Sequence, residues 1–515
     1  MRKILLLVVL LIFVLASPMF AAETFDETKN KAESGDAEAQ AALGMIYEYG
    51  KGVQQDYKKA FEWYEKAALQ GNAVGQYNLG GMYYNGYGVS QDYKKAVEWF
   101  EKSAAQGNAY GQRWLGSAYV DGNGVPQDNK KAVEWYKKAN EWIEKAALQG
   151  DAQAQYVLAC SYQYGEGVPQ DYKKAVEWHE KAALQGDAQA QLALGVMYYN
   201  GYGVSQDYKK AVEWFEKSAA QGNAYGQKWL GTAYNEGKGV QQDNKKSVEW
   251  YEKAALQGDS DAQLILGNRY TDGIGIPKDY KKAFEWFEKG ALQGNANCQF
   301  FLGMKYYIGE GITQDYKKAF EWYEKGALQG NATCQYALGA AYKSGKGIIQ
   351  DYKKAFEWFE KAALQGDSDA QYLLGTSYIK GDNVCHQDDK KGFEWIEKAA
   401  LQGNSKAQGL VGAMYLKGRG VPQDYKKAFE WFEKAALQGN DEAQYTLAIM
   451  YKNGEGVPAD FVFAYAYLNI SASVNNHPEV IEQRDLIKKE MTPAQIEKGQ
   501  DLSRELLKKI NENKK

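Results

Sequence analysis

The pattern of apolar and polar positions along the chain repeats in blocks, and each block predicts two short helices. In one typical block, Cys334, Leu338 and Tyr342 recur at helical spacing. Gly345 follows as a helix stop, and Asp351 then stands at the N-cap position of a second run rich in strong helix formers. A unit this short cannot bury its apolar face alone, so the blocks must stack on one another.

The glycine that opens each block sets the period. Successive opening glycines lie 36 residues apart, except for one interval of 43 and one of 37. These glycines are Gly35, Gly71, Gly107, Gly150, Gly186, Gly222, Gly258, Gly294, Gly330, Gly366, Gly403 and Gly439. Twelve units therefore cover about 35–474, and the last of them is degenerate.

The irregular units agree with this interpretation. The long interval contains seven extra residues, 136–142, which are close to two helical turns and should keep the apolar face of the helix in phase. The other extra residue, near Asn383, falls in the turn between two helices, where insertions are tolerated. Residues 82–112 match 197–227 residue for residue, so the chain grew by copying several units at once. Arrays that grow in this way usually tune a surface rather than a single reaction centre.

Both ends of the chain differ from the repeats. Residues 1–22 combine a positive start, an apolar run and small residues, which is typical of a secretory signal peptide, with an uncleaved anchor as the alternative. The protein is therefore expected in the periplasm or outside the cell. Residues 23–34 and 475–515 are predicted to form helical caps on a solenoid that covers 35–474.

Composition excludes some functions. Lys and Arg total 62 against 66 Asp and Glu, which gives a net charge of -4. The chain therefore lacks the excess of basic residues that would indicate a nucleic-acid partner. No basic amphipathic run indicates a membrane surface, and no membrane insertion is expected after removal of the signal. The chain has 54 glycines but only 8 prolines. The regular spacing of the glycines predicts that they separate successive helices.

The repeated unit LGxxYxxGxGVxQDYxKAxEWxxKAAxQGxxxAQ, as at 43–76, resembles the Sel1-like repeat, and the resemblance covers about 85% of the chain. The resemblance implies an all-α fold, a right-handed superhelical solenoid of antiparallel helix pairs. It also implies a scaffold or adaptor that binds protein or peptide partners. A cysteine-rich bacterial branch of the family has been linked to penicillin binding, so a hydrolase of β-lactams or cell-wall peptides is the alternative. Structural or carbohydrate-binding roles remain as further alternatives.

The cysteines do not follow that branch. It pairs two cysteines eight residues apart, whereas here Gly290 and Gly326 stand where the partners of Cys298 and Cys334 would be. Alanine usually faces alanine at these two positions, glycine faces serine or alanine in three other units, and cysteine appears only opposite glycine. We therefore expect the two positions to touch in a tight core. The cysteines expected to be free thiols are Cys160, Cys298, Cys334 and Cys385.

Candidate catalytic groups are weakly supported. Ser377 and Lys380 form an S-x-x-K pattern, but the companion motifs of penicillin-recognising enzymes are absent. His179 replaces an aromatic residue of a second helix, and His386 lies in an irregular turn with Cys385 and Asp382 that supplies too few metal ligands. His477 stands apart from both. We therefore predict a non-catalytic protein without a metal or cofactor.

Tryptophan recurs at one position of the second helices, which indicates packing rather than a ligand cage. These residues are Trp63, Trp99, Trp135, Trp178, Trp214, Trp250, Trp286, Trp322, Trp358, Trp395 and Trp431.

A stripe on the first helices is more informative, because its residues differ widely between units. In one unit the stripe is Tyr110, Trp114, Ser117 and Asp121. First helices line the concave surface of helical solenoids, and large aromatic residues there are typical binding anchors. Local packing between first helices is the alternative. The predicted partner-binding residues are Tyr110, Trp114, Tyr225, Trp229, Phe301, Met304 and Ile308.

Overall fold

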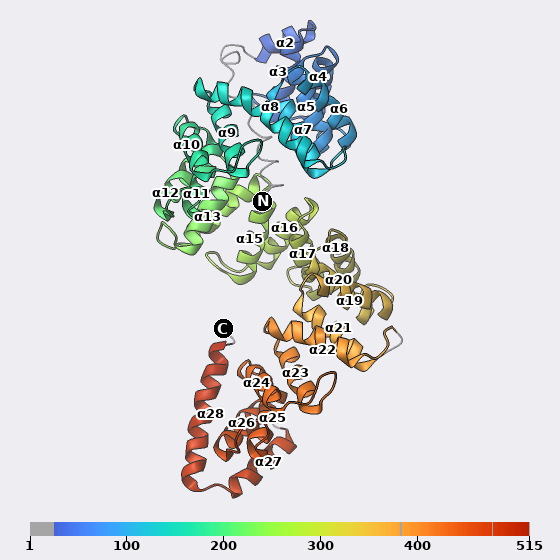
Figure 1. Ribbon diagram of the computed structural model, residues 1–515, viewed down its shortest axis with the longest axis vertical. Helices are drawn as coiled ribbons and strands as arrows, with labels where there is room; N and C mark the ends of the chain where they lie inside the picture. Colours follow the sequence, from blue (N-terminus) through green and yellow to red (C-terminus); the bar gives the residue numbers. More distant parts are fainter. Residues whose placement is uncertain (1–24, 382–383, 476, 514–515) are drawn as a thin grey trace. The chain divides into compact units, whose positions relative to one another are not determined.

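The computed structural model describes residues 25–381, 384–475 and 477–513, and every regular element in these ranges is an α-helix (Figure 1). The predicted signal peptide lies outside the described residues. The helices form two compact units, one ending at Asp259 and the other beginning at Ser260. The predicted all-α fold of stacked helix-turn-helix repeats is confirmed.

The first unit consists of a capping helix, α2 (Phe25–Glu33), and six helix pairs in which each helix packs on the next. The first helices of its pairs are α3 (Ala37–Tyr49), α5 (Ala73–Asn85), α7 (Ala109–Asp121), α9 (Ala152–Tyr164), α11 (Ala188–Asn200) and α13 (Ala224–Glu236). The second helices are α4 (Tyr57–Leu69), α6 (Tyr93–Ala105), α8 (Asn129–Leu148), α10 (Tyr172–Leu184), α12 (Tyr208–Ala220) and α14 (Asn244–Leu256).

The second unit contains six further pairs and two closing helices, α27 (Pro478–Lys489) and α28 (Pro493–Asn513). Its first helices are α15 (Ser260–Asp272), α17 (Ala296–Ile308), α19 (Ala332–Ser344), α21 (Ser368–Lys380), α23 (Ser405–Lys417) and α25 (Asp441–Asn453). Its second helices are α16 (Tyr280–Leu292), α18 (Tyr316–Leu328), α20 (Tyr352–Leu364), α22 (Asp389–Leu401), α24 (Tyr425–Leu437) and α26 (Phe461–Asn475).

The helix ends follow the predicted capping residues. The Asp351 carboxylate accepts a hydrogen bond from the Lys354 N–H at the start of α20. Gly345 ends α19 in the left-handed conformation, with φ of 70°, a geometry that costs glycine little. In the C-terminal cap, Gln495 accepts from the Thr492 N–H and donates its own N–H to the Thr492 hydroxyl, so these residues form a capping box.

In ten of the twelve pairs, a glycine of the first helix faces a buried side chain of the second, which is an aromatic ring in nine pairs and Ile396 opposite Gly375 in the tenth. A Cβ added to Gly339 would lie 2.8 Å from the Phe359 ring, so the two helices approach closely only because the side chain is missing. Two units carry alanine instead, and there the facing residue is smaller. These exceptions are Ala159 with His179, and Ala448 with Leu468.

The predicted contact between cysteine and glycine is confirmed. A Cβ on Gly290 would collide with the Cys298 sulfur, and one on Gly326 with the Cys334 sulfur. Both thiols are fully buried and free, and burial raises the pKa of each to about 12. They fill core space and are not reactive.

A ladder of glutamines joins successive pairs. The Gln335 amide donates to the Ala327 carbonyl of the preceding helix, and its oxygen accepts from the Gln365 amide thirty residues later. The same two bonds recur along both units. The buried oxygen of Gln112 has no hydrogen-bond partner, because the residue thirty positions later is Trp142 in the seven-residue insertion.

Because of the insertion, the following helix pair, α9 and α10, packs further along α8 than the equivalent pairs do on their second helices. The turn glycine Gly88 approaches Tyr57, the first residue of its neighbouring second helix, whereas Gly167 approaches Tyr136, seven residues into α8. Val133 is consequently 42% exposed, while the equivalent Val97 is 4% exposed. The buried positions of α8 nevertheless stay in phase, as predicted for an insertion of two turns.

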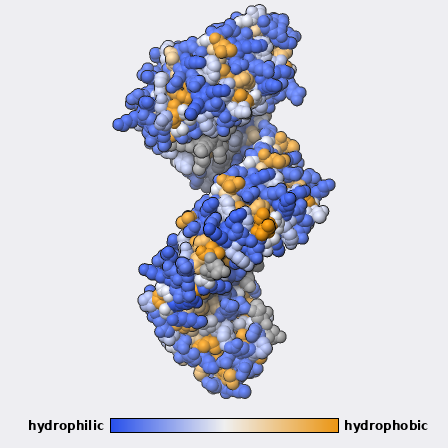
Figure 2. All heavy atoms as spheres, turned by 90° about the vertical axis from the view of Figure 1, so that its right-hand side faces the viewer, coloured by the Kyte–Doolittle hydropathy of each residue, from blue (hydrophilic) through white to orange (hydrophobic). Residues whose placement is uncertain are grey.

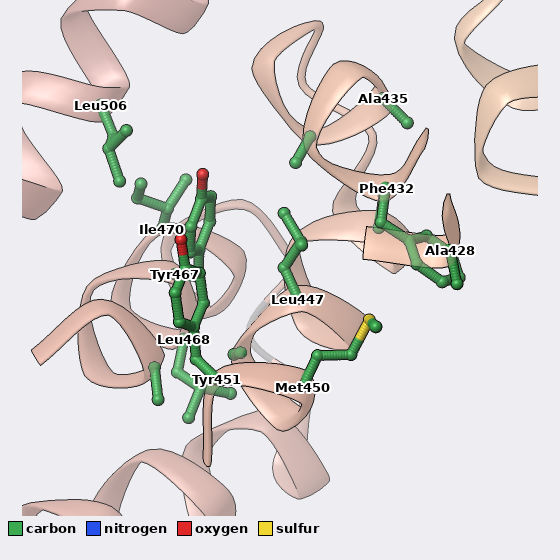
Figure 3. Close-up of a cluster of buried hydrophobic side chains, with 14 of the residues drawn as sticks. Ala428, Phe432, Ala435, Leu447, Met450, Tyr451, Tyr467, Leu468, Ile470 and Leu506 are labelled. Carbon is green, nitrogen blue, oxygen red and sulfur yellow. The ribbon is translucent and has the colours of Figure 1, made fainter. Parts of the chain in front are cut away.

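The closing helices cover the apolar side of α26. Figure 3 shows Leu506 of α28 directed toward Ile470 of α26, beside the stacked rings of Tyr451 and Tyr467. The core continues into α24 and α25 through alternating aliphatic and aromatic side chains. The last repeat is thus shielded from solvent by helices that do not continue the repeat.

Candidate binding surface on the first helices

The first helices approach one another more closely than the second helices do. Direct contacts join α3 with α5 and α5 with α7, and in the second unit α15 with α17 and α17 with α19. Contacts between successive second helices are less extensive. The first helices therefore form the inner side of these stacks, where a partner can touch several units at once.

Both tryptophans of the predicted stripe are half-buried and stack on the preceding second helix. Trp114 lies parallel to Phe100, with ring centroids 5.1 Å apart, and contacts Tyr84 at 5.0 Å. Trp229 stacks on Phe215 at 5.5 Å in the same way. The structure thus gives each tryptophan a packing role while leaving part of its ring accessible.

The other residues of these two stripes have different surroundings. Tyr110 is half-buried against Tyr77, and Tyr225 lies beside the Lys228 ammonium at 4.9 Å. Ser117 is buried and shares a 2.9 Å hydrogen bond with the Tyr136 hydroxyl. Asp121, by contrast, is exposed.

The three predicted binding residues of α17 become more exposed toward the C-terminal end of the helix. Phe301 stacks on Phe287 at 5.1 Å, Met304 is half-buried, and Ile308 is 56% exposed at the end of the helix. Phe301 therefore occupies the same environment as the two tryptophans, and Ile308 is the freest of the predicted binding residues.

Sequence reasoning missed a tyrosine that meets a different polar set in each of three units. Tyr84 donates to the Asp121 carboxylate at 3.2 Å, and its oxygen accepts from the Asn123 amide at 2.8 Å. The equivalent tyrosines are Tyr199, which contacts Glu236 and Lys238, and Tyr307, which accepts from Lys346. Each partner lies one unit further along, so only the stacking of units brings these groups together.

A buried polar junction holds the inserted segment of α8. Arg113 donates to the Ser161 hydroxyl at 3.0 Å and forms an ion pair with Glu166. Asn140, an inserted residue, donates to the Glu166 carbonyl at 2.7 Å and accepts from Ser161 at 2.9 Å. Burial raises the pKa of the neighbouring Cys160 thiol to about 12, so this thiol is protonated and unreactive at neutral pH.

A second buried charge lies on α17. Lys305 is fully buried, its ammonium lies 2.5 Å from the Glu310 carboxylate, and it sits 5.2 Å from the centre of the Tyr280 ring. A signal was present in the sequence, because a lysine stands at a position where four other units carry buried methionine.

The remaining catalytic candidates are not assembled. The Ser377 hydroxyl donates to the Leu373 carbonyl of its own helix, while Lys380 is exposed at the helix end. His386 is exposed, and Asp382 lies outside the described residues. Within the described ranges, no group of three or more His, Cys, Asp or Glu residues is placed to hold a metal ion.

His179 is buried in the aromatic position of α10. Its Nε2 lies 3.1 Å from the Gln163 side-chain oxygen, and its ring packs on Tyr156 at 5.5 Å. Its Nδ1 has no hydrogen-bond partner. Burial lowers the pKa of His179 to about 3, so the ring is neutral in the folded protein at neutral pH.

Acidification should therefore weaken the structure around α10. A histidine in the unfolded chain has a pKa near 6.5. Below that pH the unfolded chain therefore binds a proton at His179, whereas the folded protein does not. Between pH 7 and pH 5 this difference removes about 2 kcal/mol of stability. His179→Leu copies the pairing of Leu468 with alanine and should abolish this part of the pH dependence. Urea unfolding of both proteins at the two pH values measures it, and equal shifts of the midpoint would show that His179 is not the cause.

The repeated tryptophans of the second helices lie beneath lysines, half-buried in every unit except that of the buried Trp286. Each has a lysine three residues later whose ammonium covers the ring, as with Lys361 at 3.9 Å from the Trp358 centroid. The ammonium shields the exposed face of the indole. This arrangement recurs at the same repeat position and gives no unit a distinct surface.

The helix pairs, the glycine and glutamine contacts between them and the varied inner face define a Sel1-repeat solenoid. The Sel1 repeat profile matches thirteen segments, at residues 37–72, 73–108, 109–141, 137–151, 152–187, 188–223, 224–259, 260–295, 296–331, 332–367, 368–404, 405–440 and 441–476. The chain therefore belongs to the Sel1-repeat family. The long unit around α8 is matched in two overlapping parts, so twelve structural units give thirteen matches.

One solved structure supports this assignment, and two others are also similar in sequence. A protective antigen of uropathogenic Escherichia coli with an SLR fold shares 34% identity over 96% of both chains, with a TM-score of 0.59. A Sel1 repeat protein from Oxalobacter formigenes shares 36% identity over 60% of this chain and 89% of its own, with a TM-score of 0.49. Helicobacter pylori cysteine rich protein B shares 29% identity over 26% of this chain and 96% of its own, with a TM-score of 0.22. No curated protein matches the sequence.

The face drawn in Figure 2 is largely hydrophilic, with separate apolar patches. Among the residues that the structure describes, none of the helices has the length and apolar character needed to cross a membrane.

Proposed function

We propose that the protein is a non-catalytic scaffold that binds protein or peptide partners on the inner face of its first helices. The observation that carries this proposal is the contrast between two copied segments. Phe100 with Trp114 and Phe215 with Trp229 keep the same stacking, whereas polar residues further along differ: Asp121 and Asn123 stand where the second segment has Glu236 and Lys238. A fold that required only packing would gain nothing from changing these surface residues.

The changed residues alter the chemistry presented by each unit. In the first copy, Tyr84 faces the Asp121 carboxylate and the Asn123 amide. In the second copy, Tyr199 faces the Glu236 carboxylate and the Lys238 ammonium group. Tyrosine supplies both apolar area and a hydrogen-bonding hydroxyl, and it is enriched at protein interfaces. Sites of this kind in several repeats suit an extended partner that contacts more than one unit.

We also propose that the protein is exported to the periplasm or the medium. The leader-like pattern of residues 1–22 supports export. The similar Escherichia coli protein is described as a protective antigen, a role that would suit an exported protein. Partners in the cell envelope or outside the cell are therefore the first to test.

The hydrolase alternative is not proposed. The Ser377 hydroxyl is directed to a carbonyl of its own helix, and the buried cysteines are held in their neutral form by raised pKa values. A nucleophile needs a nearby base to become reactive, and these groups lack that arrangement.

The scaffold proposal is tested by capture of partners from an envelope extract. The variant Trp114→Ala/Trp229→Ala should lose a partner that the wild-type protein retains, because it removes both aromatic anchors from the inner face. Ala193 and Ala337 occupy this position in other units, so the backbone tolerates the change.

The matched control is Trp99→Ala/Trp214→Ala, which removes two half-buried tryptophans from the second helices of the same copied segments. It should keep the partner. Recovery of the partner by the first variant, at unchanged helicity, would contradict binding through the inner aromatic residues.

A further inference from the structure

A row of exposed leucines follows the ends of the second helices in the second unit. Leu292, Leu328, Leu364 and Leu401 each close one of these helices, and each is between 70% and 72% exposed. The same side chain at the same position in successive repeats forms an ordered apolar edge. Single exposed leucines are common on proteins, but an ordered series of them is a surface feature.

The fold does not need leucine at this position. Ala105 and Ala220 end the equivalent helices α6 and α12 of the first unit and are exposed, whereas the other second helices of that unit end in exposed leucines: Leu69, Leu148, Leu184 and Leu256. The residues that follow them, Gln106 and Gln221, cap those helices just as glutamine does after the leucines. The leucines therefore supply exposed apolar area rather than packing.

The next residue of the row shows what covers such a leucine. Leu437 ends α24 and is half-buried, because α28 packs against α24. The Asn513 side-chain amide donates to the Leu437 carbonyl at 3.1 Å. Leu506 and Ile510 of the same helix are buried in the adjoining core. The occupant is thus an amphipathic helix that covers the leucine and satisfies a carbonyl left free by the helix end.

We propose that the four open leucines form a second docking surface, which binds an amphipathic helix of a partner protein. The helix lays an apolar face of leucine or isoleucine residues on the row, and its asparagine or glutamine side chains donate to the free carbonyls at the helix ends. This is the contact that α28 makes at Leu437, continued along the neighbouring repeats. The surface lies on the second helices and does not depend on the binding face proposed for the first helices.

The probe is a labelled peptide of residues 493–513, the sequence of α28, added to the full-length protein. Saturable binding by the wild-type protein is expected, and Leu292→Ala/Leu328→Ala/Leu364→Ala/Leu401→Ala should weaken it at least tenfold. A control variant, Ile274→Ala/Ile349→Ala, removes exposed apolar side chains elsewhere in the same unit and should bind as the wild-type protein does. A peptide with Leu506→Asn and Ile510→Asn should not bind.

Two results would overturn the proposal. One is absence of saturable binding to the wild-type protein. The other is equal binding by the quadruple variant, because the peptide would then be binding elsewhere, at Leu437 in place of α28 or at the equivalent leucines of the first unit. Since Ala105 and Ala220 already end helices in this fold, the quadruple variant is expected to keep its helicity, which circular dichroism checks.

Discussion

Gly347→Ala should break the packing between α18 and the turn after α19, with a local loss of stability of at least about 3 kcal/mol. Gly347 has φ of 81°, a conformation that alanine avoids. An added Cβ would also lie 2.5 Å from the Tyr316 carbonyl carbon and would collide with its oxygen. Because this neighbour is backbone within a helix, it cannot rotate away as a side chain would.

Gly52→Ala separates the two contributions. Gly52 holds the same place in the first repeat with φ of 71°, yet a Cβ there would meet no atom within 4 Å. Its loss should be limited to the cost of the left-handed conformation, about 1–2 kcal/mol. Native-state hydrogen exchange of α18 to α20 in one variant, and of α3 and α4 in the other, measures both losses. Equal losses would mean that contact with the preceding repeat contributes nothing.

Removing the partner of the buried lysine should be nearly as damaging. Glu310→Ala leaves the Lys305 ammonium buried without its countercharge, and breaking a buried pair in this way costs about 3–5 kcal/mol. Lys305→Met should be close to neutral, because other repeats carry buried methionine there. The methionines concerned are Met82, Met197, Met414 and Met450.

The two changes together provide the control. Lys305→Met should rescue Glu310→Ala, since the double variant contains no uncompensated buried charge. Urea denaturation and hydrogen exchange of α17 measure the four proteins of this cycle. If Glu310→Ala alone is no less stable than Lys305→Met, the pair does not hold this helix, and the burial of Lys305 must be balanced by its other neighbours.

The fold could be predicted from the sequence because its causes are local and repeated. Capping residues such as Asp351 and Gly345 fix helix ends within a few residues, and twelve copies make each position recognisable. Even the contact of Cys298 with Gly290 was predictable, because the volumes at the two positions compensate from unit to unit.

The candidate site was predictable only in part. The stripe containing Trp114 and Trp229 was assigned to the first helices, but its stacking on Phe100 and Phe215 depends on how one repeat is rotated against the next. The periodicity of a single repeat does not specify that rotation. The polar contacts of Tyr84 and the ion pair of Arg113 could not be predicted for the same reason, because the partners of both residues come from a neighbouring repeat.

The identity of residues 82–112 with 197–227 has a consequence for inheritance. Each copy makes the same contact with the helix that precedes it: the Ser103 hydroxyl donates to the Ala73 carbonyl at 2.8 Å, and Ser218 to Ala188 at 2.7 Å. A chain that passed directly from Gln112 to Lys228 would therefore contain no junction that this protein does not already use. Recombination between the two copies could lengthen or shorten the protein by a whole block, and the contacts that the copied residues make on either side would already exist in this protein.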